Sequence, residues 1–192
     1  MKQGGGHYKG SEFEREISRR LSLWWTQDLP EPRDDIFWRT SGSGARATTR
    51  GKALKRTAYE YGDITCRDPI GKPLIDLFLI ETKRGYSDGA DLLDLLNPKK
   101  ETYILDWWRK ADKEMRQAGR RNKLIILSRN RRKTVVFFDL DFLNLWEMYS
   151  GIMNYFWYIK CVLGDEKLVV MDFEGFLKNL QPNDIVENFG VK

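Results

Sequence analysis

The spacing of apolar residues along the chain predicts two amphipathic helices. The first covers residues 10–27, where Ser11 followed by Glu14 has the pattern of a capping box. Its apolar positions recur at helical spacing and are Phe13, Ile17, Leu21 and Trp24. The second covers residues 101–119 and ends at Gly119, which suits a left-handed C-terminal cap. Its apolar stripe consists of Tyr103, Trp107, Ala111 and Met115.

Short apolar runs bounded by Gly, Pro and polar residues predict the strands of a sheet. These runs occupy residues 36–40, 61–68, 74–84, 123–128 and 134–140. The sequence PIGKP between the second and third runs predicts a hairpin turn that pairs these two strands. A further helix, two strands near residues 156–163 and 167–172 and a short final helix follow. This order of elements predicts an α/β fold with a mixed central sheet flanked by helices.

A chain of 192 residues has the length of about one domain. The expected organisation is a flexible tail at residues 1–9, a core at 10–138 with a mobile basic loop at 45–58, and an aromatic-rich C-terminal extension at 139–192, packed on the core. No apolar run reaches the roughly 18 residues that a membrane span needs, and the N-terminus lacks a signal-peptide core. Cys66 and Cys161 lack the paired spacing of a zinc site or a disulfide framework. We therefore expect a cytoplasmic protein with free thiols and no membrane partner.

Positive charge is concentrated before residue 139. The net charge is +5, yet residues 139–192 carry 9 acidic and 4 basic residues, so that the remaining 29 basic and 19 acidic residues lie in 1–138. Two stretches, 39–56 and 109–133, contribute most of the excess. Arginine and lysine at this density are typical of a protein that binds the phosphate backbone of a nucleic acid. The alternative is an ordinary solvated surface.

The third predicted strand ends in charges. Because alternate side chains of a strand share a face, Leu77, Leu79, Glu81 and Lys83 point the same way. One interpretation is a strand that simply emerges into solvent with a weak Glu–Lys pair. The other is a site at the end of the sheet.

The preceding strand supports a site, because it contains Asp63 directly after Gly62, a residue that permits close backbone approach. In the predicted hairpin, Asp63 and Glu81 meet on one face, and two adjacent carboxylates repel unless a positive charge lies between them. Oxygen ligands of this kind suit Mg²⁺ or Mn²⁺, and the backbone carbonyl of Thr82 can add another ligand. With Lys83 beside the metal, this arrangement predicts metal-assisted phosphodiester hydrolysis without a histidine base.

Asp63 on one strand and Glu81-Thr82-Lys83 on the next resemble the PD-(D/E)xK nuclease superfamily, with Gly62-Asp63 in place of Pro-Asp. The stretches KGSEFERE, FWRTSGSG, GDI and IETK also follow the order seen in archaeal-type Holliday-junction resolvases and their phage-encoded relatives. The resemblance covers residues 9–84, with a generic helix and strand to about 138. It implies a restriction-endonuclease-like fold with an α-β-β-β-α-β core, and host cytoplasm as the location of a phage-encoded enzyme.

The resemblance also assigns roles to individual residues. Glu14 matches a glutamate that positions metal or water, Asp63 and Glu81 match the metal-binding carboxylates, and Lys83 matches the catalytic lysine. Arginines that approach the scissile phosphate are matched by Arg15 and Arg39. Glu14 also fits a simple capping role.

Further candidate DNA contacts come from the residues themselves. Ser41 and Ser43 can bond phosphate or serve as turn residues. The basic residues of the mobile loop that would contact phosphates are Arg46, Arg50, Lys52, Lys55 and Arg56. Trp107 and Trp108 can stack on bases, although Trp107 on the apolar stripe fits the core better.

These observations predict a Mg²⁺- or Mn²⁺-dependent DNA endonuclease, selective for branched DNA in the manner of a junction resolvase. A resolvase is expected to be a homodimer, because a junction presents two symmetric strands. One alternative is a phage nuclease for duplex or other branched DNA. A second is a non-catalytic DNA-binding module on a nuclease fold. An RNA-binding or membrane-surface protein has only the basic stretches in its favour.

Overall fold

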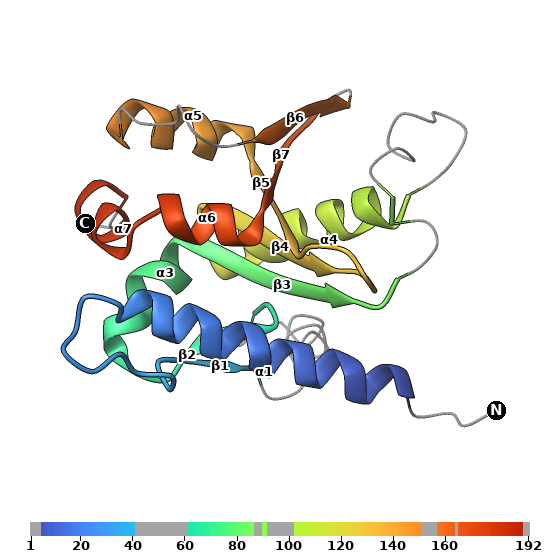
Figure 1. Cartoon of the computed structure of the whole chain (residues 1–192). Helices are drawn as coiled ribbons and strands as arrows, with labels where there is room; N and C mark the ends of the chain where they lie inside the picture. The colour runs from blue at the N-terminus through green and yellow to red at the C-terminus, as the bar shows by residue number, and fades with distance from the viewer. Residues whose placement is uncertain are drawn as a thin grey trace.

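The computed structural model describes residues 5–40, 61–86, 90–91, 102–150, 157–163 and 165–189. Its centre is a five-stranded mixed sheet in the order β3-β4-β5-β7-β6 (Figure 1). The parallel pair is β3 (Phe78–Arg84) with β4 (Asn122–Ser128). The other neighbours are antiparallel and involve β5 (Val135–Asp139), β6 (Tyr158–Leu163) and β7 (Glu166–Asp172). The predicted α/β fold with a mixed sheet flanked by helices is confirmed.

Helices cover both faces of this sheet. Phe78 and Ile80 face one core cluster, formed with α1 (Gly5–Trp25), α5 (Leu140–Ser150), α6 (Phe173–Asn179) and α7 (Pro182–Asn188). Leu79 faces a second cluster, in which α4 (Tyr103–Ala118) contributes the buried Trp108. The alternation of side chains along β3 therefore separates α1 from α4, and the two helices lie on opposite sides of the strand.

A small second sheet supports the edge strand β3. Its strands β1 (Phe37–Arg39) and β2 (Ile64–Cys66) are antiparallel and lie beside α1 (Figure 1). The backbone N–H of Phe37 donates to Ser22 Oγ at 2.8 Å, which fixes β1 on the helix. Both strands confirm the sequence-based expectation for residues 36–40 and 61–68.

The first helix begins earlier than predicted. It starts at Gly5, so residues 5–9 are helical rather than a tail, and Ser11 lies inside the helix instead of capping it. Glycine disfavours a helix by about 1 kcal/mol but does not forbid it. Extending an existing helix needs no new nucleation, which explains why the long amphipathic segment continues toward the N-terminus.

The predicted strand at residues 74–84 begins only at Phe78. Before it lie a 3₁₀ turn, Pro69–Gly71, and the short helix α3, Lys72–Leu77. Pro73 suits the first turn of a helix, and Lys72 pairs with Asp76 one turn later. PIGKP is therefore no hairpin turn: β2 pairs with β1, and β3 pairs in parallel with the distant β4.

The second helix follows its prediction at the ends and only in part in its buried stripe, of which Ala111 is buried and Trp107 and Met115 are partly buried. Thr102 caps its start and Gly119, at φ 68°, ends it. The buried positions are Ile104, Trp108, Ala111 and Glu114. Trp108 is thus the core tryptophan, whereas Trp107 is half-buried, the reverse of the prediction. The centre of the buried stripe lies at Ile104 and Trp108 in place of Tyr103 and Trp107, because Trp108 packs with the side chains of β3 and β4.

The C-terminal region completes the central sheet. β7 lies between β5 and β6, and Phe142, Trp146 and Phe173 belong to the same cluster as α1. Residues beyond 138 therefore supply strands and core side chains to the sheet itself. The predicted final helix is divided into α6 and α7 at Leu180 and Gln181, just before Pro182.

In the part of the chain that the structure describes, no helix has the length and apolar character to cross a membrane. Cys66 and Cys161 are free thiols, and partial burial raises the pKa of each.

Gly62 is the residue that allows β2 to approach β3, and its replacement tests this contact. Its φ is 75°, and an added Cβ would lie 2.8 Å from the carbonyl oxygen of Ile80. Gly85 has a similar φ of 87° but open space around it. We expect Gly85→Ala to lose about 1–2 kcal/mol of unfolding free energy from the backbone conformation alone. Gly62→Ala should lose clearly more in urea unfolding. Equal losses would mean that the close approach is not needed.

Candidate active site

Asp63 is fixed at the edge of β3 by backbone contacts. Its N–H donates to the carbonyl of Ile80 at 2.8 Å, and its own carbonyl accepts from the N–H of Thr40 at 2.8 Å. Its carboxylate Oδ2 accepts from the N–H of Thr82 at 2.9 Å. Asp63 therefore lies beside Glu81 although the two strands form no hairpin.

Glu81 and Lys83 lie on β3 with their side chains on the same face as Leu79. Lys83 Nζ is 2.6 Å from Glu81 Oε2 and 3.7 Å from Asp63 Oδ2. Asp63 and Glu81 are buried and Lys83 is largely so, with no side chain of the three more than 15% exposed. One ammonium thus contacts two carboxylates in a place largely shielded from water, where charge interactions are strong.

Glu14 approaches the same place from α1. Its Oε2 accepts from Arg39 Nε at 2.8 Å. Burial raises the pKa of Glu14, and the negative charge of Asp63 raises it further, which outweighs the opposing effect of Arg39. The charges of Asp63 and Lys83 thus both act on Glu14, which belongs to the same group of interacting charges. The structure therefore brings Glu14, Asp63, Glu81 and Lys83 together, while their chemical roles stay predictions.

Burial and neighbouring charges shift the pKa values of Glu81 and Lys83. Burial, followed by the charge of Asp63, raises the pKa of Glu81 to about 7. For Lys83, burial acts to lower the pKa, but the Glu81 and Asp63 carboxylates outweigh it and the pKa lies above its ordinary value. The lysine therefore keeps its proton at neutral pH. Added positive charge would favour the ionised form of Glu81.

Glu114 is a neighbouring carboxylate that the sequence-based analysis missed. It is buried on α4, its negative charge also raises the pKa of Glu81, and its Oε2 lacks a hydrogen-bond partner within the described residues. Its side chain belongs to the buried stripe of α4, three residues after Ala111. The sequence signal that could have identified Glu114 is an acidic residue at a position of the helix that faces the core.

The donor atoms at this place fit a hard divalent cation. In a strand, the N–H and C=O of one residue project to the same side, and the N–H of Thr82 points to Asp63. The Thr82 carbonyl therefore lies on the side of Asp63, as a third oxygen donor. Among the described residues, no three or more His, Cys, Asp or Glu side chains form a metal-binding group of their own. Two carboxylates with one carbonyl agree with Mg²⁺, which keeps several waters and also takes phosphate oxygens.

The predicted DNA contacts are only partly within the described chain. Arg39 lies against Glu14, and Arg15 lies on the exposed surface of α1. The remaining candidates lie outside the described residues: Ser41, Ser43, Arg46, Arg50, Lys52, Lys55 and Arg56, with the loop 45–58.

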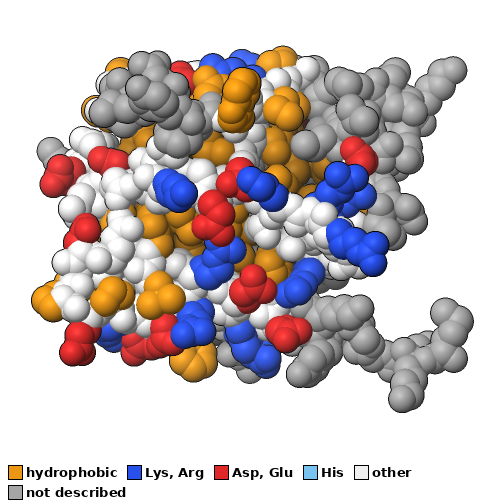
Figure 2. Space-filling model, viewed as in Figure 1, with side chains coloured by type: hydrophobic (Ala, Val, Ile, Leu, Met, Phe, Trp, Pro, Cys, Tyr) orange, Lys and Arg blue, Asp and Glu red, His pale blue; other side chains and the backbone are white. Residues whose placement is uncertain are grey.

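The basic stretch 109–133 is less positive than its sequence suggests. Carboxylates from other elements pair with several of its cations, as in Arg109 with Glu166 and Arg120 with Asp76. Lys123 is almost completely buried between Asp112 and Asp139. Acidic and basic side chains are likewise interleaved over the face that carries α1 and β3 (Figure 2).

One comparison with known proteins gives a match. The model of a family described as "Phage putative PDDEXK endonuclease" matches residues 5–187, from the start of α1 into α7. The matched region includes all four residues that the structure brings together. Comparisons with the curated proteins and with the solved structures give no match.

The raised pKa of Glu81 predicts a pH-dependent stability in metal-free solution. The folded protein retains the Glu81 proton up to about pH 7, whereas the unfolded chain loses it near the ordinary value of 4.5. Stability from this group is therefore fully present below pH 4.5 and is lost as the pH rises through about 7. Glu81→Gln cannot ionise, so above pH 7 it should be more stable than the wild type by up to roughly 3 kcal/mol.

Urea unfolding in EDTA across this pH range measures the difference. Glu12→Gln, at an exposed position of α1, is the matched control and should leave the pH profile unchanged. Parallel profiles for Glu81→Gln and the wild type would show that the folded protein does not perturb Glu81.

Proposed function

Because the chain belongs to the family of phage PDDEXK endonucleases, we propose that it is a divalent-metal-dependent DNA endonuclease whose active site contains Asp63, Glu81 and Lys83. The observation that carries the proposal is the contact of one buried ammonium with two buried carboxylates, at 2.6 and 3.7 Å. A purely structural ion pair needs one carboxylate. A second one beside it costs stability unless it serves another purpose.

The cation would be held by Asp63, Glu81 and the backbone carbonyl of Thr82. These hard oxygen donors favour Mg²⁺, with Mn²⁺ as the alternative. When bound, a divalent cation supplies Lewis acidity that activates water and neutralises charge on the scissile phosphate. The close contact of Lys83 with Glu81 is the arrangement that a cation would replace, because both positive groups compete for the same carboxylate.

Lys83 would then act on the substrate. Water attacks phosphorus in line with the leaving oxygen, the new P–O bond forms as the old one breaks, and negative charge grows on the phosphoryl oxygens. A lysine that keeps its proton at neutral pH stabilises that charge and does not serve as the base. Glu14 and Arg39, joined by their ion pair, would position the water and the phosphate beside it.

We propose further that the enzyme prefers branched DNA, as a Holliday-junction resolvase does, and works as a homodimer. The support is the order of four short motifs along residues 9–84, which resembles the resolvases. A two-fold dimer would place two active sites on the two symmetric strands of a junction. The basic residues at 45–58 would add phosphate contacts.

Removing either metal-binding carboxylate should abolish cleavage. Asp63→Asn and Glu81→Gln keep the shape of the side chains, so the loss would reflect charge and not folding. Each should lower Mg²⁺-dependent cleavage of labelled DNA by at least about 10²–10³-fold, and Lys83→Met should have a similar effect. Glu12→Gln is the control with normal activity. Wild-type cleavage by Asp63→Asn would place the active site elsewhere.

Substrate preference is tested by binding without cleavage. With Ca²⁺ in place of Mg²⁺, the wild type should bind a four-way junction more tightly than the duplex of its arms or the single strand. Fluorescence anisotropy gives the dissociation constants, and sedimentation gives the number of chains per junction. Equal affinity for junction and duplex would exclude the resolvase assignment and leave a duplex nuclease.

A further inference from the structure

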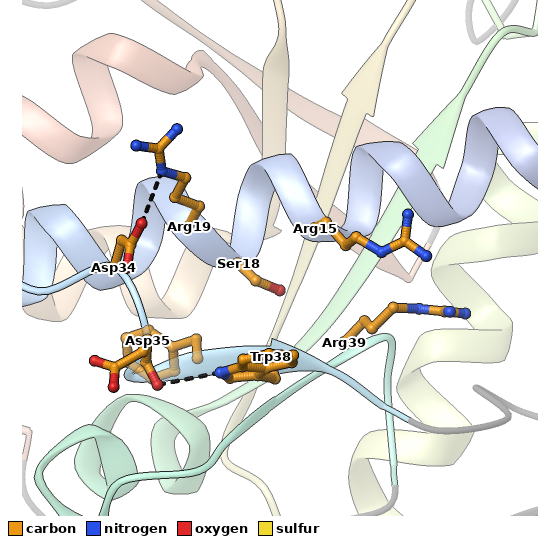
Figure 3. Close-up of a pocket in the computed structure, with 8 residues that line it drawn as sticks. Arg15, Ser18, Arg19, Asp34, Asp35, Trp38 and Arg39 are labelled. Carbon is orange, nitrogen blue, oxygen red and sulfur yellow. Dashed lines mark hydrogen bonds and ion pairs between the residues drawn. The ribbon is translucent and has the colours of Figure 1, made fainter.

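An open pocket of about 230 Å³ lies between α1 and β1. Arg15 and Ser18 line it from the helix, and Trp38 and Arg39 line it from the strand (Figure 3). The guanidinium groups of Arg15 and Arg39 lie at one end of the pocket, and Asp34 and Asp35 lie at the other. The pocket therefore combines an aromatic surface with two cations at one end.

Trp38 is exposed although its neighbours in the chain are core residues. Ile36 and Phe37 are completely buried, whereas Trp38 is 51% exposed. Its indole Nε1 donates to the backbone carbonyl of Asp35 at 3.2 Å, which holds the ring in place along β1 (Figure 3). A fixed, half-exposed indole adds little to the core and offers a ready surface for a planar ligand.

The charges around the ring point to an anionic ligand at one end only. Arg19 is neutralised by Asp34, and Asp35 is paired with Arg33. Arg15 pairs with no carboxylate of the described residues, and Arg39 is bound to Glu14 through Nε, with further N–H groups in its guanidinium. A phosphate would therefore be held at the end that Arg15 and Arg39 share.

The same end of the pocket adjoins the active site. Arg39 contacts Glu14, and the next residue, Thr40, donates its N–H to the carbonyl of Asp63. A nucleotide bound between Trp38 and the arginines would lie next to the phosphate that Asp63 and Glu81 act on. Its base would stack on Trp38 only if it were unpaired, because bases of intact duplex are covered by their neighbours.

We propose that this pocket binds one unpaired nucleotide of the DNA substrate, with its base on Trp38 and its phosphate between Arg15 and Arg39. The proposal rests on the proposed nuclease function and defines its substrate further: DNA with an unpaired base beside the cleaved phosphate. The pocket selects such DNA through stacking, which depends little on base identity.

The test compares two DNA duplexes of equal length, one fully paired and one with a two-nucleotide bulge. Binding is measured by anisotropy with Ca²⁺, so that cleavage plays no part. The wild type should prefer the bulged duplex, and Trp38→Ala should lose that preference by about 5- to 150-fold, the range that base–aromatic stacking gives on alanine substitution. Trp38→Phe should keep part of it. Trp157→Ala, at a residue 96% exposed on the approach to β6, is the matched control and should bind as the wild type does.

A second measurement identifies the base directly. 2-Aminopurine in the bulge should lose fluorescence on binding to the wild type and keep it with Trp38→Ala. Excess deoxyadenosine monophosphate should not displace the bulged DNA, since the site takes a nucleotide within a strand. An unchanged preference in Trp38→Ala, with normal folding by circular dichroism, would overturn the proposal while the nuclease function stands. Absence of any DNA binding by the wild type would overturn both.

Discussion

The backbone hydrogen bond from Asp63 to the carbonyl of Ile80, at 2.8 Å, holds the two halves of the site together. It requires β2 to approach β3 as closely as another strand would, and Gly62 at φ 75° removes the side chain that would prevent this. That contact sets the position of the Asp63 carboxylate beside Thr82 and its distance to Lys83. It also determines how strongly the charge of Asp63 raises the pKa of Glu81 and Glu14. The strand β1 and Arg39 are placed by the same segment, through the bond of Thr40 to Asp63.

The site gathers more negative charge than its environment readily tolerates. Glu14, Asp63 and Glu81 are opposed by Lys83 and Arg39, with Glu114 behind them on α4. Burial raises the free energy of the excess negative charge. The pKa of Glu81 is therefore raised, which means that this carboxylate binds a proton more tightly than usual. A bound cation would neutralise the same excess of negative charge. The folded protein therefore holds carboxylates that repel one another, and a bound metal ion would reduce this repulsion.

Local patterns in the sequence were enough to identify residues that the structure brings together, but not the contacts that hold them in place. The charged end of β3 and the Gly62-Asp63 pair follow from strand alternation and glycine geometry, which are local. The prediction of a hairpin was wrong. Ile75, Leu77 and Leu79 alternate as in a strand, but Ile75 and Leu77 lie in the helix α3, which Pro73 and the Lys72–Asp76 pair favour. The parallel pairing of β3 with β4 joins residues more than 40 positions apart, and no local pattern encodes it. Trp108, Glu114 and Trp38 depend on such long-range packing, which explains why their environments were missed.

β3 is an edge strand of the central sheet, and exposed edges invite pairing with other chains. Asp63 occupies this edge at two points, with its N–H on the carbonyl of Ile80 and its carboxylate on the N–H of Thr82. The residue that we propose as a metal ligand thus also shields the sheet from adding a foreign strand. A substitution of Asp63 keeps its backbone N–H on Ile80, but Asp63→Ala would remove the acceptor of the Thr82 N–H and leave that edge group open. Asp63→Ala therefore carries a risk of aggregation that Asp63→Asn and a substitution of Lys83 do not.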